Sequence, residues 1–176
     1  MSCMGRCMVF IDRSPHRVEG YIGYPQMEDY AILQNDPVER MVVHMNPYTC
    51  STVYAVTRTP VWKKAMSIWA QREFPPFNVG EVQFELAICY QGKSKVIPTL
   101  MWLRSTENIP QRDLELAARD ENYFIEGWWL NTKKKSEHAE FLEIMGGVLA
   151  KSEDQVNHVI MGVTQSIDAY VKERLS

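Results

Sequence analysis

The chain has 176 residues, of which 45% are hydrophobic, 23% charged and 11% aromatic. This length predicts one domain over residues 1–176, and the ordinary apolar fraction excludes a disordered, fibrous or low-complexity chain. The net charge of −3 argues against a dedicated nucleic-acid binder, whose surface is normally basic, so we expect no sequence-specific nucleic acid as a partner.

Charge is unevenly distributed along the chain. Residues 58–112 carry eight Lys and Arg against four Glu, a balance of +4, whereas residues 136–176 carry seven acids against three bases, a balance of −4. This asymmetry allows a locally basic face for an anionic lipid, a phosphate or the acidic end of a neighbouring copy. A solvated surface of mixed charge is the simpler interpretation of the same counts.

Targeting and membrane-spanning patterns are absent from the sequence. No stretch approaches the roughly 18 apolar residues of a membrane span. The apolar start of the chain is interrupted by Asp12 and Arg13 too early for a signal peptide. We therefore expect a cytoplasmic protein without signal peptide or transmembrane segment, in which the four cysteines, Cys3, Cys7, Cys50 and Cys89, are reduced thiols.

The first third of the chain predicts short extended segments followed by one helix. Residues 1–20 are expected to include a flexible N-terminal arm, with a short strand at 8–11 and a loop at 20–25. Segments 30–33 and 38–45 are expected to be extended and separated by a turn at Asn-Asp-Pro. Residues 53–57 predict a strand, and Thr59 followed by Pro60 predicts the start of a helix near 60–70.

Residues 82–103 carry the clearest local pattern. Apolar side chains alternate with their neighbours from Val82 to Tyr90, a Gly-containing turn follows at 91–95, and a second apolar run returns at 96–103. Period-two alternation on both sides of a short turn predicts a β-hairpin. Pro98 in the returning segment indicates an edge strand or a bulge.

The rest of the chain predicts a short helix at 108–120, a strand at 123–130 and a helical C-terminal part over 136–176. Ser136 and Ser152 are expected to cap two helices. The second helix has apolar residues at helical spacing, namely Val156, Val159, Ile160, Val163, Ile167 and Tyr170. The predicted fold class is α+β, with a small, mostly antiparallel sheet, one inserted helix, and C-terminal helices on or beside the sheet.

Residues that commonly carry catalysis or bind metals are few. Cys3 and Cys7 with His16 lack the second close ligand pair of a zinc site. A small hydrolase would need a pocket that joins Cys50 and His44, and no partner for such a pair has a recognisable context. We therefore predict a non-enzymatic protein without cofactor or metal.

Three segments carry a resemblance to a known family. The chain reads Pro-Phe-Asn-Val-Gly at 76–80, Phe-Glu-Leu-Ala-Ile-Cys-Tyr at 84–90 and Pro-Thr-Leu-Met-Trp at 98–102. This order resembles the core of rhabdovirus matrix proteins, and residues 50–103 are similar to it in plan. The Lys-rich N-terminal arm and the proline-tyrosine motif of the animal-virus proteins are missing here, and the shortness and acidity fit a plant-infecting, cytoplasmic branch.

The resemblance implies a structural protein of the virion and host cytoplasm that self-associates, binds the viral nucleoprotein and attaches peripherally to an anionic membrane. Candidates for the anionic surface are Lys63, Lys64, Lys133, Lys134 and Lys135. Candidates for self-association are the apolar residues from Val156 to Tyr170 named above. The alternative is a soluble adaptor whose C-terminal amphipathic helix binds a partner protein.

Overall fold

The structure is a computed structural model that describes every residue except 1, 13–16, 49–51, 77 and 106–121. The strands are β1 (Ser2–Asp12), β2 (Val18–Gly23), β3 (Ala31–Ile32), β4 (Val56–Thr57) and β5 (Ser94–Ser105). The helices are α1 (Pro37–Met45), α2 (Thr59–Trp69), α3 (Val79–Gln91), α5 (Ile125–Leu130), α6 (Lys135–Leu149) and α7 (Glu153–Leu175). Short 3-10 turns are η1 (Pro25–Met27), η2 (Thr52–Tyr54) and η3 (Thr132–Lys134).

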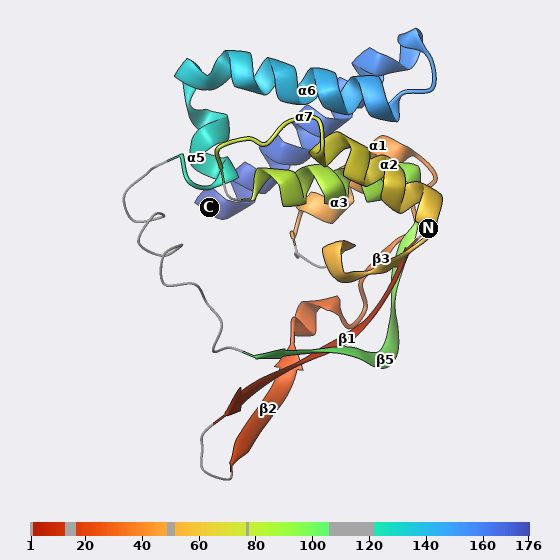
Figure 1. Cartoon of the computed structure of the whole chain (residues 1–176), viewed down its shortest axis with the longest axis vertical. Helices are drawn as coiled ribbons and strands as arrows, with labels where there is room; N and C mark the ends of the chain where they lie inside the picture. Colours follow the sequence, from red (N-terminus) through yellow and green to blue (C-terminus); the bar gives the residue numbers. More distant parts are fainter. Residues whose placement is uncertain (1, 13–16, 49–51, 77, 106–121) are drawn as a thin grey trace.

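The fold is α+β, as the sequence predicts. The helices form one body, and a curved sheet extends from that body on one side (Figure 1). The helix predicted near 60–70 is confirmed as α2, and the helical C-terminal part is confirmed as α6 and α7. The predicted helix at 108–120, Cys50 and His16 lie outside the described residues.

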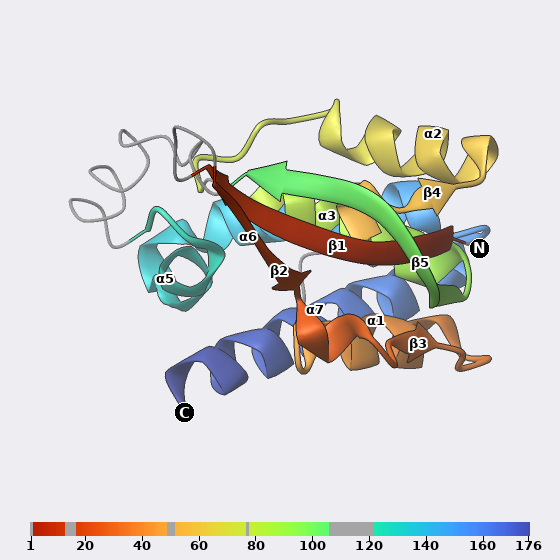
Figure 2. The ribbon, with the colours of Figure 1, turned by 90° about the horizontal axis from the view of Figure 1, so that it is seen from below.

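The sheet is built around β1, with the strand order β2-β1-β5-β3. β5 runs parallel to β1 along most of its length, while β4 and β2 pair antiparallel with the beginning and the end of β1. Figure 2 shows β1 and β5 side by side in front of the helices. The sheet is therefore mixed, and Ser2–Asp12, expected to belong to a flexible arm, is its central strand.

The hairpin predicted over 82–103 is wrong in its first half. Residues Val79–Gln91 form helix α3, and only the returning segment is a strand, β5. Every residue from Val82 to Cys89 is buried, so α3 is covered on all sides. A helix without a solvent face has no amphipathic pattern at period 3.6, and the chance alternation of large apolar residues with polar or small ones then resembles a strand.

Two further segments predicted as extended are helical. Asp36 and Pro37, interpreted as a turn, begin α1, because the Asp36 carboxylate accepts a hydrogen bond from the Glu39 N–H at 2.8 Å. Residues 125–130, predicted as a strand, form α5. Its Trp128 is fully buried against Phe74 and Phe141. Tertiary burial has overridden the β propensity of these aromatic and branched residues.

The C-terminal helices pack on other helices rather than on the sheet. α7 lies against α1 and α6, and α6 also contacts α2 and α3. Gly162 of α7 faces α1 so closely that a Cβ atom there would meet Val38 at 2.6 Å. The absence of a side chain at this position allows the two helices to approach each other, and α7 is thus an integral part of the core.

Candidate functional site

Apolar side chains lie on the exposed surface of the sheet. Along the register, Met8 of β1 has Ile22 of β2 on one side and Leu103 of β5 on the other. Side chains of directly paired residues point to the same face of a sheet, so these three form one row. Ile22 is 51% exposed and Leu103 is 62% exposed. Large apolar residues that remain this accessible in a row are a candidate for an interaction surface.

The row continues toward the end of β1. Phe10 is paired with Gly20 and Ser105. Val18 lies two residues before Gly20 in β2, so its side chain is on the same face, and it is 68% exposed. We call Met8, Phe10, Val18, Ile22 and Leu103 the distal apolar face. Three strands contribute to it, and it lies on the part of the sheet that extends away from the helical body (Figure 1).

The strand β2 forms an edge of the sheet. In the described part of the chain it pairs with β1 alone. Natural edge strands are commonly protected by Pro or by several charges, but β2 has no Pro and one charged residue, Glu19, which is ion-paired with Arg17 at 2.7 Å. An apolar edge of this kind can accept another strand.

A stack of aromatic rings attaches the sheet to the body. Tyr54 of η2 stacks on Trp102 of β5 with ring centroids 4.4 Å apart, and Tyr24 stacks on Trp102 at 5.9 Å. Arg104 lies over the Tyr24 ring and donates a hydrogen bond to its hydroxyl. These rings bind each other, so they hold the sheet in place rather than serve as a free stacking platform for bases.

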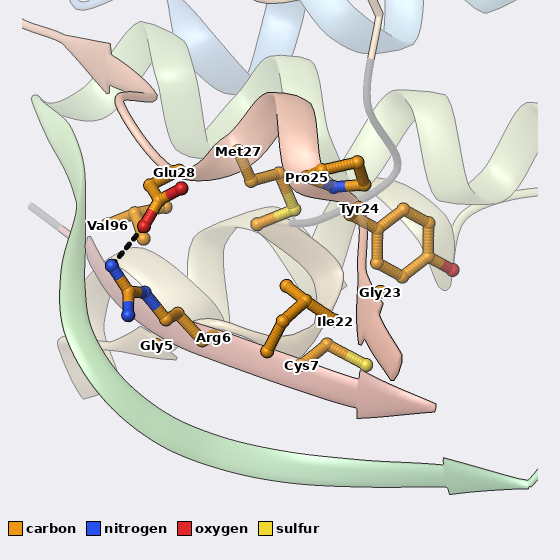
Figure 3. Close-up of a pocket in the computed structure, with 10 residues that line it drawn as sticks. All are labelled: Gly5, Arg6, Cys7, Ile22, Gly23, Tyr24, Pro25, Met27, Glu28 and Val96. Atoms are coloured by element: carbon orange, nitrogen blue, oxygen red, sulfur yellow. Dashed lines mark hydrogen bonds and ion pairs between the residues drawn. The ribbon is translucent and has the colours of Figure 1, made fainter. Parts of the chain in front are cut away.

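A small hollow lies between β1, the end of β2 and η1. Figure 3 shows the ion pair of Arg6 and Glu28 at one end of it and Tyr24 at the other. Its volume is about 10 Å³, which is space for about one water molecule. Cys7 lines this hollow, and burial raises the pKa of its thiol, which disfavours the nucleophilic thiolate. The hollow is too small for a substrate.

The five candidate lysines do not form one surface. Lys63 and Lys64 are on α2, and the Lys64 ammonium lies 3.5 Å from the Leu149 carbonyl at the end of α6. Lys133, Lys134 and Lys135 lie at the start of α6, and Lys134 is ion-paired with Glu137 at 2.8 Å. A helix of this length separates the two groups by about 20 Å at 1.5 Å per residue.

The residues expected to carry self-association are buried within the monomer. Val159, Val163 and Ile167 are fully buried, Tyr170 nearly so, and Val156 and Ile160 are partly buried. Because α7 uses its apolar stripe to pack on α1 and α6, that stripe is available neither for another copy nor for an adaptor's partner. The two oppositely charged parts of the chain are also joined inside the monomer. Arg72, in the basic segment 58–112, forms an ion pair with Glu140, in the acidic segment 136–176.

One buried polar cluster has residue types that occur in catalysis. The His44 Nε2 atom lies 3.2 Å from a Glu85 carboxylate oxygen, and the Tyr30 hydroxyl lies 2.5 Å from His44 Nδ1. Burial opposes the charged imidazolium, but Cys89 and Glu85 beside it raise the pKa of His44 to about 10. Both members of the His44–Glu85 pair have no solvent exposure, so no substrate reaches them. The cluster joins α1 to α3.

Sequence reasoning missed the distal apolar face because residues 20–25 were interpreted as a loop. Gly20 and Gly23 favoured that interpretation. The strand signal was the β-branched and aromatic content around these glycines, at Val18, Tyr21 and Ile22. The pairing with β1, which places Ile22 beside Met8 and Leu103, cannot be obtained from either segment alone.

Among the described residues, no three His, Cys, Asp or Glu side chains gather as metal ligands would. None of the described helices is long and apolar enough to span a bilayer. Comparisons of this chain with family models, with curated proteins and with solved structures found no match.

Proposed function

We propose that this protein is a non-enzymatic structural protein that self-associates, and that the surface it uses is the β2 edge with the distal apolar face. The observation that carries the proposal is the exposure of Val18, Ile22 and Leu103 on a sheet whose edge strand has no Pro and only one charged residue. A monomer gains nothing from this exposure, whereas an assembly buries it.

A second copy of the chain fits this edge better than an arbitrary partner does. Two β2 strands related by a two-fold axis pair antiparallel, and with Gly20 opposite Gly20 each Val18 lies opposite an Ile22. Apolar pairs of this kind stabilise a sheet by about 0.2–1 kcal/mol each. A shift of one residue, with Glu19 opposite Glu19, places like charges against each other and is disfavoured.

The resemblance over residues 76–102 supports a more specific version of this function. In that version the assembled protein is a viral matrix protein that binds the nucleoprotein and an anionic membrane surface. The segment that carries the resemblance folds as α3 followed by β5, so the likeness is one of sequence order. The exposed Lys133 and Lys135 near the start of α6 supply the basic charge for the membrane contact.

Sedimentation analysis of a concentration series tests self-association. Ile22→Lys places a charge on the edge and is expected to shift the protein to monomer, because an edge lysine must lose its hydration when a second strand pairs. Leu130→Lys is the matched control, since Leu130 is 55% exposed on α5, away from the sheet. The proposal is wrong if the unaltered protein is a monomer at all concentrations or if both variants weaken assembly equally.

Flotation with vesicles that contain phosphatidylserine tests the more specific version. The triple change of Lys133, Lys134 and Lys135 to Glu is expected to abolish vesicle binding without loss of helical circular dichroism. Each basic residue near an anionic surface contributes about 1 kcal/mol, so the reversal of three charges has a large effect. Vesicle binding that survives the change would remove the membrane role from this segment and leave self-association untouched.

A further inference from the structure

A second feature of the molecule is a groove at the end of the helical body, away from the distal apolar face. Residues of α1, α2, α3, α6 and α7 line it, and Figure 1 shows the turn between α6 and α7 at this end. Its volume is about 420 Å³. Sites for small molecules typically measure about 300–1,000 Å³, so the groove has room for a ligand.

The side chains that line the groove make it positive. Arg40, Lys64 and Lys151 contribute three cationic groups, and none of its lining residues is acidic. Asp36, which caps α1, is a nearby acid, and its charge acts on Tyr90 in the lining. Glu153 and Asp154, in the first turn of α7, are exposed acids that do not line the groove, so the lining itself carries a positive balance.

The helix ends around the groove do not cancel this charge. α3 and α6 end at the groove and bring carbonyl ends of about −0.5 charge each, whereas α1, α2 and α7 begin there and bring N–H ends of about +0.5 each. The negative ends are therefore more than offset. The helix ends thus leave the sign of the potential, which the side chains set, unchanged.

Arg40 is the fixed element of the site. Only 7% of it is exposed, and its N–H groups donate to the carbonyls of Gln34, Asn35, Cys89 and Tyr90 at 2.6–2.9 Å. All four acceptors are neutral, and one hydrogen on Nη2 has no partner among the described residues. Buried charges in proteins are normally paired with an opposite charge. Among the described residues, no carboxylate forms an ion pair with this guanidinium.

We propose that this groove binds a phosphate-bearing anion, with Arg40 as its fixed cation and Lys64 and Lys151 as flexible ones. Guanidinium and ammonium groups form strong, charge-assisted hydrogen bonds with phosphate oxygens. Tyr90, also in the lining, adds a neutral hydroxyl that can donate to the same oxygens. This binding site is independent of the sheet surface proposed for self-association.

Titration calorimetry with pyrophosphate at 0.1 M salt tests the site directly. Lys64→Gln and Lys151→Gln are each expected to weaken binding about tenfold, or about 1.4 kcal/mol, because each removes one charge-assisted contact with the phosphate oxygens. Lys63→Gln is the matched control, since Lys63 is the neighbouring residue on α2 but does not line the groove. It is expected to leave the affinity unchanged.

The source of the phosphate is distinguished by a parallel measurement with vesicles that contain a phosphoinositide. Binding to both pyrophosphate and vesicles, weakened by Lys64→Gln but not by Lys63→Gln, assigns the groove to phosphate groups in general. Binding to vesicles alone with the same dependence assigns it to a lipid headgroup. The proposal is overturned if neither probe binds, or if Lys63→Gln and Lys64→Gln weaken binding equally, which is the sign of diffuse surface attraction.

Discussion

The helical body and the sheet differ in how far their apolar side chains are buried. In the body, Leu86, Trp128 and Phe141 are fully buried within one continuous core that includes all the long helices. The sheet has a separate small core of Met4, Met27 and Val96. Its distal apolar face remains exposed instead. The body thus stabilises the fold by burial, whereas strand pairing and the aromatic stack on Trp102 hold the sheet, whose distal apolar side chains stay in contact with solvent.

The largest effect should follow from the removal of one partner of the buried pair in the body. Glu85→Leu leaves His44 without its carboxylate, and we expect a loss of about 3–5 kcal/mol in the free energy of unfolding. Urea denaturation followed by circular dichroism measures it. A loss below 1 kcal/mol would show that the pair contributes little and that the body depends on apolar packing alone.

The same pair predicts a pH dependence of stability. The pKa of His44 is raised to about 10 in the folded protein, above the ordinary value of 6.5 expected in the unfolded chain. A raised pKa stabilises the fold fully below pH 6.5, and this contribution is lost as the pH rises toward 10. The free energy of unfolding should therefore fall between pH 6.5 and 10, and the fall should be smaller in His44→Gln. Equal slopes in the two proteins would contradict the assignment to His44.

One substitution made in both regions compares them directly. Leu86→Ala in α3 should cost about 2–5 kcal/mol, because it leaves a cavity in a fully packed core. Leu103→Ala on the distal apolar face should change the stability of the monomer by less than about 0.5 kcal/mol. Thermal unfolding at low protein concentration, where assembly does not contribute, measures both. Similar losses would mean that the sheet face is covered in the monomer.

A smaller effect, of opposite sign, is expected at Gln83. Its side chain is fully buried in α3, and neither of its polar atoms has a hydrogen-bond partner among the described residues. Gln83→Met keeps the length of the side chain and removes the cost of two unpaired polar atoms, so we expect a gain of about 1 kcal/mol. A loss of stability would indicate that a buried water molecule satisfies the amide.

The smallest effect is expected at the surface of the sheet region. Glu28→Gln removes the exposed ion pair with Arg6, and such pairs contribute about 0–1 kcal/mol. The difference in unfolding free energy should disappear at 1 M salt, where the Debye length is about 3 Å. A loss that persists at high salt would show that Glu28 contributes through its hydrogen bond with Arg6 rather than through screened charge attraction.

Local signals in the sequence determined the helices whose two faces differ. Thr59 and Pro60 mark the start of α2, and the spacing from Val156 to Tyr170 predicts α7, because each of these helices has a polar face in water and an apolar face in the core. The same signals gave the fold class. The sequence also indicated Lys64 as a candidate for contact with an anionic surface, and the structure places this residue in the groove.

Only the tertiary structure decided the conformation of α3, the central position of β1 and the use of the α7 stripe. Val82 to Cys89 is surrounded by other helices, so its pattern contains no information about a solvent face, and alternation was mistaken for a strand. The distal apolar face and the groove combine residues from three strands and five helices that are distant in the sequence. Such surfaces depend on which elements pack together, because burial and charge balance are properties of the assembled neighbours and not of any one segment.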